Sequence, residues 1–178
     1  MKISEAMAHF ESKLISEGFE TSLPSGNQEY PVESDLYARR SLRAGPFPAE
    51  DHFFLHDMTG RNSGPAIKEL HDRARAWVNS LQRMPRMMRL KVPCIVSIGI
   101  AEPGFDAEAL RAVMDYPQKP LVGGEVNCLY LVDLSQKKLI SRGMSTTSVD
   151  GMNFKFPKID PINRSLILVQ NITTSLFA

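Results

Sequence analysis

The chain has 178 residues, of which 43% are hydrophobic and 23% charged, and its formal net charge is +1. This composition excludes a wholly disordered chain, and the length suits a single globular domain over residues 1–178 that needs neither a disulfide nor a structural metal. The first residues lack the apolar core of a signal peptide and no apolar run approaches about 18 residues, so we expect a soluble cytoplasmic protein without membrane contact.

The first predicted element is a helix that starts at Ser4, a candidate N-cap, and ends near Gly18, which favours a left-handed turn. Three strands are predicted after it. Residues 19–23 begin the first, residues 35–42 form the second, and residues 52–58 form the third because consecutive apolar residues lie there between turn formers. The amino-terminal third of the chain therefore reads as one helix followed by strands.

A long amphipathic helix is predicted over residues 65–84, with Pro65 in its first turn and one apolar stripe along its length. The run 92–101 that follows carries no charge. A run this short and apolar is typical of a strand covered on both faces by helices. Asp106 then caps a short helix. This segment predicts an α/β architecture.

The remaining predicted elements are strands. A strand over residues 125–134 and its hairpin partner over 138–144 are followed by a second apolar strand at 165–170 and an apolar end at 176–178. Strand–helix–strand units give parallel neighbours, and the hairpin adds an antiparallel strand. We predict an α/β (or α+β) fold, a mixed, partly parallel β-sheet with helices packed on it. The strand order stays open.

The two cysteines, Cys94 and Cys128, each lie inside an apolar run. In a chain without a secretion signal, such cysteines are expected to be reduced, buried thiols that act as small hydrophobes. Basic residues that would lower a thiol pKa do not surround them. We expect neither a disulfide nor a reactive thiol.

Positive charge gathers between residues 73 and 101, which hold six basic residues and no acid. Arg75, Arg83, Arg86 and Arg89 are the candidate anion- or nucleic-acid-binding residues of this segment. On a helical wheel of the predicted helix, Arg75 and Arg83 point to different parts of the exposed arc, whereas Arg86 and Arg89, three residues apart, can act together near its C-terminus. We therefore prefer a solvated helix face with compensation of the helix dipole, and keep a phosphate-contacting patch as the alternative.

The loop that contains Gly60, Arg61 and Ser63 precedes the long predicted helix, a position where free N–H groups can hold an anion. Its spacing differs from that of a P-loop, and Pro65 removes one donor. An ordinary helix-start loop is the preferred interpretation. An enzyme that acts on a small phosphorylated ligand here is a third functional alternative.

Four possible metal ligands fall within one short segment: Asp51, His52, His56 and Asp57. On a strand the two histidines share a face, but Phe54 lies between them and crowds the gap. The helical His-Glu-x-x-His pattern is absent. We expect exposed strand-end residues and no metal or other cofactor.

The order of elements over residues 4–101 resembles that of PD-(D/E)XK nucleases, which place an Asp on one strand and Glu-x-Lys on the next to hold Mg²⁺. Asp35 matches the first acid. The next strand offers His56 and Asp57 as candidate catalytic residues but no Glu-x-Lys, and the tripeptide at residues 11–13 lies on the first helix. The resemblance implies a nuclease-like layout without catalytic activity.

Since no complete catalytic motif is present, we expect a protein that is not an enzyme. The apolar end of the chain and a hairpin with an exposed sheet edge favour a module that binds a protein partner or forms a homo-oligomer. The alternative is a nucleic-acid-binding protein of nuclease-like layout.

Overall fold

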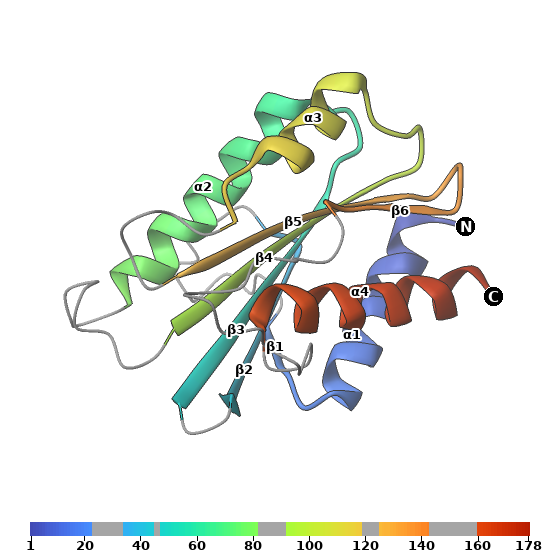
Figure 1. The fold of residues 1–178 in the computed structure, drawn as a ribbon. Coiled ribbons are helices and arrows are strands. Elements are labelled where there is room, and N and C mark those ends of the chain that lie inside the picture. Colours follow the sequence, from blue (N-terminus) through green and yellow to red (C-terminus); the bar gives the residue numbers. More distant parts are fainter. Residues whose placement is uncertain (23–33, 45–46, 82–91, 119–124, 143–159) are drawn as a thin grey trace.

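The computed structural model describes residues 1–22, 34–44, 47–81, 92–118, 125–142 and 160–178. These residues form four helices and a six-stranded sheet (Figure 1). In chain order the elements are α1 (Ile3–Ser16), β1 (Glu20–Ser22), β2 (Leu36–Ala44), β3 (Phe47–Asp57), α2 (Gly64–Ser80), β4 (Val92–Ala101), α3 (Ala107–Asp115), β5 (Val126–Asp133), β6 (Lys138–Ile140) and α4 (Pro161–Phe177).

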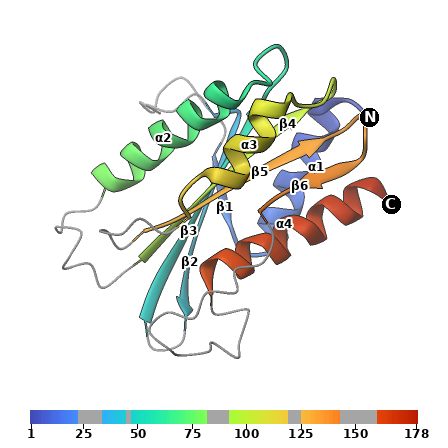
Figure 2. The same ribbon diagram turned by 45° about the horizontal axis from the view of Figure 1, so that its top comes forward.

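The strands lie in the sheet in the same order as in the chain, from β1 to β6. The pairs β3–β4 and β4–β5 are parallel, and the other three pairs are antiparallel. Helices α2 and α3 make the crossovers between the parallel strands and cover one face of the sheet, while α1 and α4 cover the other (Figures 1 and 2). The predicted α/β fold with a mixed, partly parallel sheet is confirmed.

The uncharged run 92–101 is β4, which lies between β3 and β5 and is buried from Pro93 onward. Its side chains alternate between the two faces. Val96 and Ile98 belong to the apolar cluster under α1 and α4, whereas Ile95 packs with residues of α2. The strand is therefore covered on both sides, as its composition predicts.

Helix α1 begins two residues earlier than a Ser4 cap would allow, so that prediction is wrong. The N-cap residue is Lys2, whose N–H donates to Glu5 Oε2 at 2.9 Å. The Glu5 carboxylate also favours the positive end of the helix dipole. Gly18 follows the helix with φ +82°, the left-handed conformation predicted for it.

Helix α2 starts after the N-cap residue Ser63 and has Pro65 in its first turn, as predicted. Gly64 lies against α3: an ideal Cβ on this residue would be 2.5 Å from the carbonyl oxygen of Glu108. A side chain here would push the two helices apart. The absence of a side chain thus lets α2 and α3 pack closely over the sheet.

The predicted strand at 165–170 is wrong, because this segment lies inside α4. Asp160 caps the helix by accepting hydrogen bonds from the N–H groups of Ile162 and Asn163, at 2.8 and 3.4 Å. Leu176 and Phe177 pack against the apolar cluster under α1 and α4. The apolar end of the chain therefore has an intramolecular explanation. The hairpin strand predicted over 138–144 is also shorter, ending at Ile140.

Candidate functional site

Buried ionisable side chains gather at the end of the sheet where the parallel strands β3, β4 and β5 begin. We call this region the polar end of the sheet. Its carboxylates and arginines come from β2, β3, α4 and the residue before β5: Arg40, Glu50, Asp51, Glu125 and Arg164. Glu50, Asp51 and Glu125 are 7%, 2% and 2% exposed. Because a buried charge is costly unless it is paired, their partners decide what the region does.

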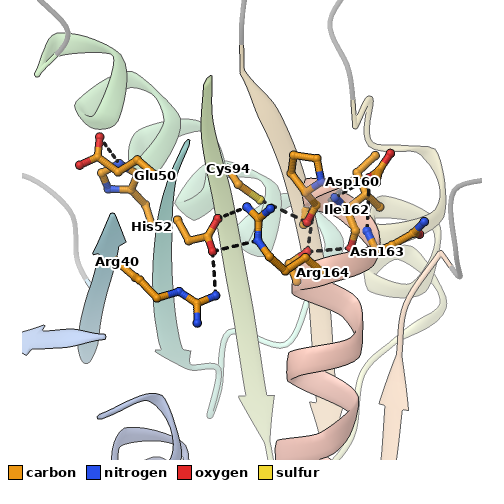
Figure 3. A network of polar contacts seen from close by, with 12 residues as sticks. Arg40, Glu50, His52, Cys94, Asp160, Ile162, Asn163 and Arg164 are labelled. Carbon is orange, nitrogen blue, oxygen red and sulfur yellow. Dashed lines mark hydrogen bonds and ion pairs between the residues drawn. The ribbon is translucent and has the colours of Figure 1, made fainter. Parts of the chain in front are cut away.

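Asp51 is held by two arginines on the face covered by α1 and α4. Figure 3 shows Arg40 and Arg164 converging from opposite sides. Arg40 donates to Asp51 Oδ2 at 3.0 Å, and Arg164 donates to Oδ1 at 2.5 Å and to Oδ2 at 3.2 Å. Arg40 also donates to the carbonyl oxygen of Glu17 and lies 4.3 Å from the ring centre of Phe19. One carboxylate thus ties β2, β3 and α4 together.

The pKa of Arg164 reflects this pairing. Burial alone lowers it, but hydrogen bonding to Asp51 and the charge of that carboxylate raise it above its ordinary value. Arg164 therefore stays cationic while it is mostly buried. The cluster is an ion triad with one acid and two bases.

Glu125 is a second buried acid at the polar end of the sheet, on the face covered by α2 and therefore opposite to the face of Asp51. It accepts hydrogen bonds from Arg75 Nε and, at 2.6 Å, from Asn79 Nδ2. Arg75 was a candidate for binding nucleic acid, but its guanidinium is engaged in this ion pair within the protein. The other candidates of the basic segment, Arg83, Arg86 and Arg89, lie outside the described residues.

His71, Ser97 and Asn127 form a hydrogen-bonded row between α2 and the sheet. His71 Nδ1 lies 2.8 Å from Ser97 Oγ, and His71 Nε2 lies 3.3 Å from Asn127 Oδ1. A serine beside a histidine is the arrangement that activates a nucleophile. Here Ser97 and His71 are fully buried, so no substrate reaches the hydroxyl. Burial also lowers the pKa of His71 to about 4, which keeps the ring neutral at pH 7. The row joins α2 to β4 and β5.

The expectation that His52 and His56 are exposed strand-end residues is wrong. Both are buried, at 1% and 0% exposed, because α2 covers this face of β3. Tyr37 Oη lies 2.8 Å from His52 Nδ1, and His52 Nε2 lies 3.4 Å from Glu50 Oε2. Among the described residues, no three His, Cys, Asp or Glu side chains form a group that fits a metal ion.

The structure brings two of the three nuclease-like candidates together. Asp35 lies directly before β2 and Asp57 ends β3, and the Asp57 N–H donates to Asp35 Oδ2 at 2.7 Å. Asp57 Oδ1 accepts from the N–H of Thr59 at 2.8 Å. His56 is directed to the opposite face by the alternation of the strand. Both carboxylates therefore already accept backbone hydrogen bonds.

The loop with Gly60, Arg61 and Ser63 has the geometry of a helix start. Gly60 adopts φ +73°, the Arg61 N–H donates to the carbonyl of Met58 at 2.9 Å, and Ser63 is the N-cap residue of α2. Each of these features serves the turn from β3 into α2. Anion binding by this loop stays a prediction.

The cysteines are buried and unbridged, as predicted. The Cys94 thiol donates to the carbonyl of Pro161 at 3.7 Å, and Ser165 Oγ donates to Cys128 Sγ at 3.4 Å. Hydrogen bonding to Cys128 and then burial raise the pKa of Cys94 well above its usual value. A thiol with a raised pKa is a poor nucleophile at neutral pH.

No protein-family model matches this chain. No curated protein and no solved structure shows significant similarity to it. None of the helices in the described ranges is both long and apolar enough to cross a bilayer. The function therefore has to be inferred from the residues of this chain.

Sequence reasoning missed the ion triad altogether. Arg164 was not a candidate, and Asp51 was weighed only as a metal ligand. One signal was available: Asp51 directly precedes the predicted strand 52–58, which contains consecutive apolar residues. A charge at the start of a buried strand needs a partner, although the sequence does not say which one. The triad holds β2 and α4 in place against β3.

Proposed function

We propose that this protein binds an extended segment of another protein, which adds as a strand to the outer edge of β2. The carrying observation is that β2 is much longer than its outer neighbour. β1 pairs with residues 37–39 of β2, whereas β2 continues to Ala44. Among the described residues, no strand lies beside residues 42–44 on that side. An unpaired strand edge is a template for a further strand.

The direction of the backbone supports this proposal. The N–H of Met58, directly after β3, donates to the carbonyl of Ile100 in β4. The carbonyl of Leu55 in β3 instead accepts from the N–H of Asp35, the residue before β2. Backbone polar groups point alternately to the two neighbouring strands, so the carbonyl of Pro48 is directed towards β4, as the polar groups of Met58 are. Pro48 is the β3 partner of Arg43, and a residue in such a non-hydrogen-bonded pair directs its own N–H and C=O outward. Arg43 therefore presents both groups to the outer edge of β2.

A second copy of the chain fits this edge poorly. Two β2 edges in antiparallel pairing place Arg43 of one copy close to Arg43 of the other, because the open stretch is so short. Like charges in facing positions destabilise a strand pair. The edge thus favours a partner with a different sequence, and the homo-oligomer that the sequence also allowed is the weaker proposal.

Hydrogen exchange of single amides tests the proposal. In the free protein we expect the Arg43 N–H to exchange much faster than the Ala38 N–H, which lies in the part of β2 with neighbours on both sides. A short peptide of alternating valine and threonine is expected to shift the Arg43 amide resonance and slow its exchange. Protection of Arg43 in the free protein would show that the edge is already covered, and the proposal would then be wrong.

A matched pair of variants completes this experiment. Arg43→Pro removes the outward N–H at a position where proline leaves the β2–β3 pairing intact. Arg43→Ala keeps the N–H and removes the side chain. We expect the proline variant alone to abolish binding of the valine–threonine peptide. Equal binding by both variants would contradict strand addition at this edge.

Nucleic-acid binding is the second candidate, favoured by one observation. The elements α1, β1, β2, β3, α2 and β4 follow one another in the order from which the sequence resemblance to PD-(D/E)XK nucleases was proposed, and the candidate acids Asp35 and Asp57 are adjacent, although β3 carries no Glu-x-Lys. If this candidate is right, the protein binds single- or double-stranded DNA or RNA at low salt, with affinity that falls steeply as salt rises. Undetectable binding at low salt, measured by fluorescence anisotropy, removes it.

A further inference from the structure

The chemistry of β2 says which extended segments its edge prefers. The two faces of the strand differ beyond the end of β1. Tyr37 packs with Trp77 of α2 and Ala38 with residues of α1, so by alternation the odd-numbered Arg43 is directed to the side that α2 covers and even-numbered residues to the side of α1. A strand added to β2 would alternate in the same way, so each of its faces meets one face of β2.

On the α2 side the open edge is positively charged. Arg43 is exposed, and no described acid forms an ion pair with it. Arg39 lies outside the open stretch, because Glu20 of β1 pairs with it, and its guanidinium is 3.5 Å from Glu50. The charge of Arg43 is therefore available to a side chain on the neighbouring strand.

On the α1 side the open edge is apolar. Leu42 is half-buried there and belongs to none of the apolar clusters formed by described residues. Its neighbour on this face, Arg40, is already engaged with Asp51. Among the described residues of β2, no charge that is free to pair is directed to this face of the open stretch, and an apolar side chain beside Leu42 would bury surface that is now exposed.

We infer that the partner of β2 is an acidic extended segment in which Asp or Glu alternates with an apolar residue. Its acidic side chains lie beside Arg43 on the α2 side, and its apolar side chain lies beside Leu42 on the α1 side. This inference rests on the proposed strand addition. Backbone hydrogen bonds from Arg43 would supply the docking, and the alternating side chains would supply the selection among extended segments.

Three short peptides test the selection, each with valine alternating with glutamate, threonine or lysine. We expect the glutamate peptide to bind more tightly than the threonine peptide by about 2- to 5-fold for each charge pair, and the lysine peptide to bind weakest. The difference is expected to shrink between about 20 mM and about 300 mM salt, because exposed charge pairs are screened. Chemical shifts of the Arg43 amide report where each peptide binds.

Reversal of the charge on β2 is the decisive variant. Arg43→Glu is expected to invert the order of the three peptides without unfolding the protein, since the side chain is exposed. Arg111→Glu makes the same charge change at an exposed position of α3 and is expected to leave the order unchanged. A preference that survives in Arg43→Glu overturns the inference.

The outcomes separate this inference from the proposed function. If all three peptides slow exchange at Arg43 with equal affinity, strand addition stands and the acidic preference is wrong. If no peptide shifts or protects the Arg43 amide, both are wrong. An intact fold in each variant is verified by the amide spectrum of β4, the strand at the centre of the sheet.

Discussion

Replacement of Asp51 by alanine is expected to lower the free energy of unfolding by about 3–5 kcal/mol, the usual cost of breaking a buried ion pair. Asp51 is 2% exposed, and the variant removes the carboxylate that pairs with Arg40 and Arg164, whose side chains are only 18% and 12% accessible. Chemical denaturation at pH 7, followed by circular dichroism, measures the change.

A surface ion pair provides the matched control. Glu69 and Arg73 on α2 are 62% and 47% exposed, and an exposed pair of this kind contributes about 0.5 kcal/mol or less. We therefore expect Glu69→Ala to have little effect. Equal losses in Glu69→Ala and Asp51→Ala would contradict a stabilising role for the triad.

A triple variant distinguishes two reasons why Asp51→Ala is destabilising: the loss of attraction between Asp51 and the arginines, and the cost of leaving the arginines buried without a counter-charge. Asp51→Leu combined with Arg40→Met and Arg164→Met removes all three charges and keeps much of the side-chain volume. Because apolar replacement of a whole buried ion cluster is often neutral, this variant is expected to be more stable than Asp51→Ala. A triple variant less stable than Asp51→Ala would show that the triad itself contributes the energy.

Acidification is expected to destabilise the protein through His71. Its pKa falls from the ordinary histidine value of 6.5 to about 4 in the folded state, chiefly because the ring is buried. Between these two values the unfolded state binds a proton that the folded state does not, so stability decreases as the pH falls from 6.5 towards 4. The shift corresponds to a loss of about 3 kcal/mol at the acidic limit.

The variant His71→Gln tests this linkage. It removes the titrating ring, so its stability is expected to depend less steeply on pH between about 6.5 and about 4, even though lost hydrogen bonds lower its stability at pH 7 by about 1–3 kcal/mol. His9→Gln, a change on the outer part of α1, is expected to retain the steep dependence. Parallel pH profiles for His71→Gln and the unmodified chain would contradict the assignment.

The parts of the fold that were predictable are those with one clear pattern. β4 carries no charge over ten residues, and α2 has a single apolar stripe that begins after Pro65. α4 was mistaken for a strand because its buried residues cover more than one side, including Ser165, Leu166 and Leu168, so the apolar residues run together. Asp160 followed by a proline was the overlooked start signal.

The candidate site was less predictable, because it depends on register and on distant parts of the chain. Asp51 meets Arg40 through the pairing of β2 with β3 and meets Arg164 across 113 positions of the sequence. The hydrophobic pattern of the sequence predicts neither the contact with Arg40 nor the contact with Arg164. The same holds for Arg75, which looked like a surface cation until the fold placed Glu125 beside it. Which charges neutralise one another is a property of tertiary structure.

The order of the strands has a consequence for the kinetics of folding. Each strand lies beside the strand that precedes it in the chain, so assembly can begin with the β2–β3 hairpin and extend outward by addition to an existing edge. The entropic cost of loop closure is smallest for that hairpin. It is larger for the parallel pairs β3–β4 and β4–β5, because their connections are longer and contain a helix. We therefore expect these two pairings to limit the folding rate, with the hairpin forming before them.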